Sequence, residues 1–124
     1  MKYVLITGGA GNLGSQLAKS LLGKGDYHVT VIDNLLTGSK RNLPEASKSF
    51  QFIKGDVNRY NDISEVMLSR QFDYVFHYAA VVGVKRTLEN PLLVLEDIEG
   101  IKNILSLSKN TSVGRIFFSS SSEV

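Results

Sequence analysis

Short apolar runs alternate with longer amphipathic segments along the chain. Runs rich in β-branched and aromatic residues occupy positions 3–6, 29–32, 50–53, 74–76 and 116–118, with Gly, Asp or Asn close to their ends. Runs of this length and composition are typical of β-strands rather than helices. Most of them show no alternation of polar and apolar residues, which indicates strands buried on both faces of a parallel sheet.

The intervals between these runs show helical periodicity. In the first interval Leu13, Leu17 and Leu21 recur every four residues, and the small residues Gly14 and Ala18 lie beside them, which allows close packing. Two later intervals also predict helices. The first has apolar residues at Ile63, Val66 and Met67, after a capping residue at Asn61 or Asp62. The second begins after residues 89–91 and has apolar residues at Val94, Ile98, Ile101 and Leu105. The polar segment 37–49 predicts at most one or two helical turns, around residues 42–47.

Strands and helices therefore alternate throughout, which predicts βαβ units with right-handed crossovers. We expect an α/β fold with a doubly wound parallel sheet of Rossmann type and the strand order 3-2-1-4-5. The helices after the first two strands should cover one face of this sheet, and those after the third and fourth strands the other.

Composition narrows the class of protein. A chain of 124 residues makes one domain, and 43% hydrophobic with 21% charged residues is usual for a soluble one. No apolar run reaches the ~18 to 20 residues of a membrane span, and the N-terminus has no secretory signal pattern. The chain has no cysteine, and its net charge of +2 comes without a basic block, so disulfides and a nucleic-acid-binding surface are not expected. We expect a cytoplasmic protein that binds neither nucleic acid nor membrane.

A glycine-rich turn follows the first predicted strand directly. Gly8, Gly11 and Gly14 form the pattern G-x-x-G-x-x-G, and the first predicted helix begins within it. Gly8 permits a tight turn, Gly11 lets the backbone approach a pyrophosphate, and Gly14 allows close packing of helix and strand. The free N–H groups of a helix N-terminus attract the same anion. Because the pattern stands between a strand and a helix, it predicts a dinucleotide site rather than a ligand-free turn.

An acidic residue follows the second predicted strand. Asp33 lies 19 residues after Gly14, close to the ~20 expected of a carboxylate that binds the adenosine ribose. Such a carboxylate repels a 2′-phosphate and favours NAD over NADP. The neighbouring Lys40 and Arg41 complicate this preference, since an arginine can accept that phosphate. The alternative is that Asp33 only caps a turn.

Other candidates are less specific. Asp56 follows the third predicted strand, where a turn residue and a contact to the adenine amino group are equally supported. Ala79 and Ala80 end the fourth, where small side chains let a dinucleotide lie across the strand ends. We interpret His77 as a core or loop residue and His28 as a surface one, because neither has a catalytic partner at a telling spacing.

Taken together, these segments resemble the extended short-chain dehydrogenase/reductase superfamily, and within it the NAD-dependent nucleotide-sugar epimerases and dehydratases. Among the subfamilies, the UDP-glucose 4-epimerases are the most similar, followed by UDP-glucuronate decarboxylases and sugar-nucleotide 4,6-dehydratases. The resemblance covers the whole chain and rests on an ordered set of segments: residues 7–15, 33–35 with 39–41, 55–57, 77–80, 84–91 and 118–124.

The resemblance implies roles for individual residues. It places the backbone of Asn12 and Leu13 at the pyrophosphate, Asp33 and Asn34 at the adenosine ribose, Asp56 and Val57 around the adenine, and Ala79 and Ala80 along the cofactor groove. Ser39 is a further cofactor-binding residue by the same resemblance. It also makes Ser121 a catalytic residue, hydrogen-bonded to the sugar hydroxyl that is oxidised. It implies no metal, a UDP-sugar substrate and a homodimer formed through the helix that carries residues 94–105.

Two departures from the family pattern affect these expectations. Asp97 stands where the family usually has an asparagine, and an ionised carboxylate only accepts hydrogen bonds. The family's Tyr-x-x-x-Lys pair is absent, because none of the five tyrosines is followed four residues later by lysine. We therefore interpret residues 1–124 as an incomplete NAD-binding domain that is inactive alone, truncated after the fifth strand and without the sugar-binding portion.

The alternatives are a non-catalytic dinucleotide-binding or sensor protein and a purely structural α/β domain. The truncation also predicts an unpaired edge at the fifth strand. Side chains among Val75, Phe76, Phe117 and Phe118 should then be partly bare, and the isolated chain should self-associate or be marginally stable.

Overall fold

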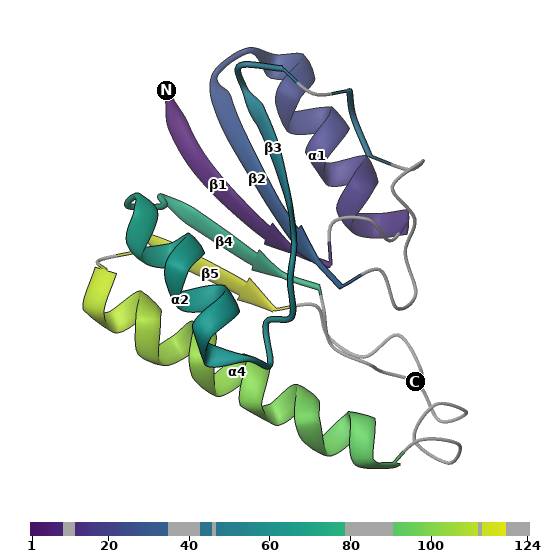
Figure 1. Ribbon diagram of the computed structural model, residues 1–124. Coiled ribbons are helices and arrows are strands. Elements are labelled where there is room, and N and C mark those ends of the chain that lie inside the picture. Colours follow the sequence, from purple (N-terminus) through teal and green to yellow (C-terminus); the bar gives the residue numbers. More distant parts are fainter. Residues whose placement is uncertain (9–11, 35–42, 46, 79–90, 112, 119–124) are drawn as a thin grey trace.

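The computed structural model describes residues 1–8, 12–34, 43–45, 47–78, 91–111 and 113–118, without the side chains of residues 12–13, 91–99 and 118. It contains a five-stranded parallel sheet in the order β3-β2-β1-β4-β5, which confirms the predicted strand order (Figure 1). In chain order the elements are β1 (Lys2–Thr7), α1 (Asn12–Lys24), β2 (Tyr27–Asp33), β3 (Phe50–Lys54), α2 (Tyr60–Ser69), β4 (Tyr74–His77), α4 (Pro91–Thr111) and β5 (Arg115–Phe118).

The central strand β1 is buried on both faces. Val4, Leu5 and Ile6 have no solvent-exposed surface, as its unbroken apolar run predicts. Successive side chains of a strand point to opposite faces, so Leu5 enters one cluster of the core, and Val4 and Ile6 enter the other. Each face of the sheet therefore has its own hydrophobic layer.

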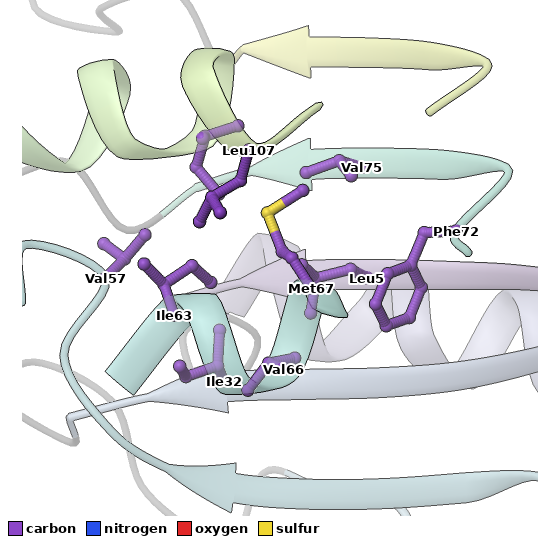
Figure 2. Close-up of a cluster of buried hydrophobic side chains, with 10 residues drawn as sticks. Leu5, Ile32, Val57, Ile63, Val66, Met67, Phe72, Val75 and Leu107 are labelled. Atoms are coloured by element: carbon purple, nitrogen blue, oxygen red, sulfur yellow. The ribbon is translucent and has the colours of Figure 1, made fainter. Parts of the chain in front are cut away.

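The larger layer lies between the sheet and helices α2 and α4. Leu5, Ile32 and Val75 reach it from three strands, and Figure 2 shows them facing side chains of α2 together with Leu107 of α4. Residues of α2 that complete this layer are Ile63, Val66 and Met67. The helices after β3 and β4 thus share one face of the sheet, as predicted.

Helix α1 covers the opposite face. Its buried side chains Ala18 and Leu21 pack in one cluster with Val4, Ile6 and Val31, and α1 contacts β1 and β2. The small side chain of Ala18 lets the helix approach the sheet closely. This arrangement confirms the predicted packing of α1, while the covering element after β2 falls partly on residues 35–42, outside the description.

Details of two helices differ from the sequence-based expectations. The residue that caps α2 is Arg59, without a side-chain hydrogen bond, so the predicted capping by Asn61 or Asp62 is wrong. The Asp62 carboxylate instead accepts the N–H of Asp56, at 3.0 Å. The described residues among 42–47 form no helix; Ser47 makes an isolated antiparallel bridge to Phe50.

The buried positions of α4 do not coincide with the apolar repeat that predicted the helix. Ile104 and Leu107 are buried, whereas Leu105 is 48% exposed. The helix carries apolar residues on two sides, so periodicity alone does not identify the side that faces the sheet. Although α4 is the longest of the described helices, none of these helices has the length and apolar character that a membrane span requires.

None of the described helices covers β4 and β5 on the face that carries α1 (Figure 1). Phe76 is half-buried and Phe117 is 40% exposed, and their rings stack with centroids 4.8 Å apart. Both were among the side chains predicted to be bare. The prediction is wrong for Val75, which points to the other face and is fully buried beneath the helices, and Phe118 lies outside the described side chains.

We expect this open aromatic face to drive self-association of the 124-residue chain. Phe117→Lys should shift the chain toward the monomer, because a charge on an exposed strand opposes edge and face pairing. The matched control is Leu68→Lys, which removes a 64% exposed side chain from α2 and should leave the association unchanged. Light scattering coupled to size exclusion at micromolar concentration measures the degree of association of all three proteins. A wild-type monomer that binds no hydrophobic dye would contradict the prediction.

Replacing either of two glycines by alanine should change the free energy of unfolding, in opposite directions. A Cβ at Gly114 would lie 2.7 Å from the Asp73 carbonyl oxygen, which accepts the Arg115 N–H at the start of β5. We expect Gly114→Ala to lower the free energy of unfolding by about 1 to 3 kcal/mol. Gly23 of α1 has nothing within 4 Å of such a Cβ, so Gly23→Ala should raise it by about 0.5 to 1 kcal/mol. Urea titration of the three proteins checks both signs.

Candidate functional site

The carboxyl ends of the strands meet at one edge of the sheet (Figure 1). Thr7, the last residue of β1, pairs with Ile32 of β2 on one side and with His77 of β4 on the other. The order of the strands reverses at this point, and open α/β sheets bind ligands at such switch points. Predicted site residues that the structure brings to this edge are Gly8, Gly14, Asp33, Asn34, Asp56 and Val57, with the backbone of Asn12 and Leu13.

The glycine turn begins as the motif predicts. Gly8 has φ 75°, a left-handed conformation that a residue with a side chain adopts only under strain. Its N–H donates to the Ile32 carbonyl at 2.9 Å, which extends the pairing of β1 and β2 by one residue. Helix α1 begins at Asn12, so Asn12 and Leu13 lie in its first turn, where backbone N–H groups have no partner within the helix. Gly14 is buried in the same turn.

Asp33 ends β2 beside this turn. It is 8% exposed, and its carbonyl accepts the N–H of Gly55 at 3.2 Å. The next residue, Asn34, is exposed. The carboxylate thus lies at the strand end where the ribose-binding hypothesis requires it.

The loop after β3 is fixed by its own hydrogen bonds. The Asp56 carboxylate accepts the Asn58 N–H at 2.9 Å, which is an Asx turn and supports the turn interpretation of this residue. Val57 is buried in the layer beneath α2 and α4. The two residues predicted to bracket an adenine therefore also have structural roles.

Helix α4 packs against the loop after β3 and hydrogen-bonds to it, a feature that was not predicted from the sequence. The Asn103 side-chain amide donates to the Val57 carbonyl at 3.0 Å. A Cβ at Gly100 would lie 2.5 Å from Asn58 Oδ1 and 3.1 Å from Val57 Cγ1, so the glycine permits close contact of helix and loop. The only signal in the sequence was a glycine inside an apolar helical pattern, which indicates close packing.

His77 is buried at the end of β4, 2% exposed. Its Nδ1 lies 2.7 Å from the Thr7 hydroxyl oxygen, and burial lowers the pKa of its imidazole to about 4. This agrees with the interpretation of His77 as a core histidine. His28 is partly exposed and packs against Tyr3; desolvation, followed by the charge of Arg70, lowers its pKa.

The buried imidazole makes stability depend on pH. The folded pKa of His77 is about 4 and that of an unfolded histidine about 6.5, so between these values only the unfolded chain takes up the proton. The free energy of unfolding should therefore fall by up to about 3 kcal/mol as the pH drops from 6.5 to 4. His77→Asn should lose this part of the slope, whereas His28→Asn, the control, should keep most of it. Urea titrations across this pH range measure the slopes, and identical slopes in all three proteins would contradict the assignment.

Several predicted site residues fall outside the described part of the chain. They are Gly11, Ser39, Ala79, Ala80 and Ser121, and the side chains of Asn12, Leu13 and Asp97 are outside it as well. Their roles stay predictions.

The comparison with known proteins decides the family. The sequence profile of the NAD dependent epimerase/dehydratase family matches residues 4–124. The chain belongs to this family. Relatives of this epimerase/dehydratase-family chain are found both among sequences and among solved structures.

Three relatives illustrate the similarity. The UDP-N-acetyl-alpha-D-glucosaminuronate decarboxylase of Bacillus cytotoxicus is 36% identical over 99% of this chain and 37% of its own length. An epimerase of Methanothermobacter thermautotrophicus superposes with a TM-score of 0.87 at 36% identity, over 98% of this chain and 35% of that one. The UDP-glucose 4-epimerase of Thermus thermophilus, solved with NAD, superposes with a TM-score of 0.83 at 33% identity, over 92% of this chain and 36% of that one. The chain thus spans a little more than a third of the length of these proteins.

Proposed function

We propose that the chain binds NAD across the carboxyl edge of its sheet and forms the cofactor-binding part of a nucleotide-sugar epimerase or dehydratase. One observation carries the proposal: a strand, a turn that begins with a left-handed glycine and a helix meet at the switch point, beside a carboxylate at the end of β2. Membership of an NAD-dependent family supports the choice of cofactor.

The residues at this edge fit such a dinucleotide. The first turn of α1 offers backbone N–H groups to the pyrophosphate, and Gly8 leaves the approach free of a side chain. Asp33 accepts hydrogen bonds from the ribose hydroxyls. Further residues in the proposed site are Gly11, Asn12, Leu13, Gly14, Asn34, Ser39, Asp56, Val57, Ala79 and Ala80.

We propose a UDP-sugar as the substrate of the whole protein, with a 4-keto sugar as the intermediate. Bound NAD would supply the acceptor for the hydride on C4 of the sugar. Ser121 would orient the C4 hydroxyl, while a tyrosine of the family motif that residues 1–124 lack would remove its proton. The proposal includes a homodimer formed through α4, on which Leu105 is exposed. Residues 1–124 alone should bind NAD without turning over a sugar.

Two measurements test the proposal. Calorimetric titration of the 124-residue chain with NAD should show binding; none would contradict the cofactor assignment. The protein in its natural length should then be supplied with NAD and several UDP- and dTDP-sugars. Turnover of any of them supports the enzyme, whereas NAD binding without turnover by the natural-length protein supports the alternative of a dinucleotide-binding sensor.

A further inference from the structure

The backbone and one carboxylate oxygen of Asp56 are held by the chain itself. The Asp56 N–H donates to the Asp62 carboxylate of α2 at 3.0 Å, and the Asp56 carbonyl accepts the Arg59 N–H at 2.9 Å. In the side chain, Oδ1 accepts the Asn58 N–H at 2.9 Å. Within the described part of the chain Oδ2 has no partner. It is therefore the oxygen of Asp56 that is left to accept a hydrogen bond from a ligand at the carboxyl edge of the sheet.

The peptide between Val57 and Asn58 connects this carboxylate to helix α4. Its N–H is the one that Asp56 Oδ1 accepts, and its carbonyl accepts the side-chain amide of Asn103 at 3.0 Å. Because a peptide is planar, a partner that holds the carbonyl also determines where the N–H points. The Asn103 amide, the peptide and the Asp56 carboxylate thus form a continuous chain of hydrogen bonds, whose members polarise one another.

The residue types on α4 suit this contact. Gly100 lies one turn before Asn103 on the same side of the helix, and a Cβ there would lie 3.1 Å from Val57 Cγ1, so the glycine lets the helix approach the loop. Asn103 is 9% exposed, and its amide donates without carrying a charge. It therefore orders the peptide without neutralising the carboxylate on the other side of it.

We propose that Asn103 is a positioning residue for adenine: through the peptide after Val57 it orients the Asp56 carboxylate so that Oδ2 accepts the exocyclic amino group of the base. This inference rests on the proposed function, in which Asp56 lies at the adenine of NAD. Asn103 itself makes no contact with the dinucleotide. Hypoxanthine has a carbonyl oxygen in place of the amino group, and a carboxylate cannot donate to it, so the arrangement selects adenine over hypoxanthine.

The test compares NAD with nicotinamide hypoxanthine dinucleotide, in which an oxygen replaces that amino group. The wild-type chain should bind NAD about tenfold or more tightly than the analogue, which lacks the hydrogen bond to the carboxylate. Asn103→Leu keeps the approximate size of the side chain and removes its amide, and it should reduce the preference to within about threefold. The matched control is Asn110→Leu, which changes an exposed asparagine of the same helix and should keep the wild-type preference.

The ratio of the two affinities separates positioning from stability. A variant that is merely less stable binds both dinucleotides more weakly by the same factor, so an unchanged ratio in Asn103→Leu would overturn the inference. A wild type that binds NAD and its hypoxanthine analogue equally would overturn it as well. A wild type that binds no NAD would instead refute the proposed function, so the two failures are distinguishable.

NMR of the wild-type chain provides a test that does not depend on a variant folding. Titration with AMP should shift the side-chain amide signal of Asn103 together with the N–H signal of Asn58. IMP, the corresponding hypoxanthine nucleotide, should shift both signals less, and the side-chain signal of Asn110 should stay fixed in both titrations. An Asn103 signal that does not move while AMP shifts that of Asn58 would overturn the inference, as would shifts of equal size with AMP and IMP.

Discussion

NAD binding should disappear when Gly11 is replaced by valine, while the fold stays largely intact. In the proposed site the backbone at residue 11 approaches the pyrophosphate, and a branched side chain would occupy the position of the phosphates. Loss of two charged hydrogen bonds at about 1.5 to 3 kcal/mol each corresponds to on the order of a hundredfold or more in affinity. Calorimetric titration with NAD measures the loss.

The control for this experiment is Gly23→Ala, which alters a glycine of α1 with open space around it. That variant should bind NAD like the wild type. Circular dichroism and urea titration establish that the Gly11→Val protein is folded. Unchanged affinity in a folded Gly11→Val protein would refute the assignment of the glycine turn to the pyrophosphate.

The second large effect concerns the choice between NAD and NADP. The carboxylate of Asp33, nearly buried at the end of β2, should accept the ribose hydroxyls and repel a 2′-phosphate. We expect the chain to prefer NAD by about ten- to a hundredfold, since one charged hydrogen bond contributes about 1.5 to 3 kcal/mol. Asp33→Asn keeps the shape, removes the charge and should reduce the preference to within a few-fold.

Asp26→Asn is the matched control, because Asp26 is exposed at the opposite end of the sheet, just before β2. It should leave both affinities unchanged. Titration of all three proteins with NAD and NADP at one ionic strength gives the comparison. NADP binding equal to or tighter than NAD by the wild type would contradict the ribose assignment.

Local patterns predicted the fold because each strand carries its own signal. The five apolar runs became the five strands, and the glycine turn and Asp33 lie at the carboxyl edge as their positions after strands implied. Such features depend on neighbours in sequence, and the parallel α/β rule then determines their placement.

Features that depend on contacts between distant segments were not predicted. The pairing of Thr7 with His77 requires the register of β1 and β4, which no local pattern contains. The side of α4 that faces the sheet was also not predicted, because apolar residues occur on two sides of that helix: Ile104 is buried and Leu105 is exposed. The role of Gly100 in close packing follows only from the structure, in which the loop after β3 lies against it.

The two hydrophobic layers of the sheet close at different moments of protein synthesis. In the part of the chain that the structure describes, every buried member of the layer under α1 precedes residue 51, ending with Phe50, so this half can pack once β1, α1, β2 and β3 have left the ribosome. The other layer needs Ile104 and Leu107 of α4. Until α2 and then α4 emerge, the nascent chain exposes the opposite sides of the same strands, among them Leu5 and Ile32. That interval is when a holding chaperone has an apolar sheet surface to bind.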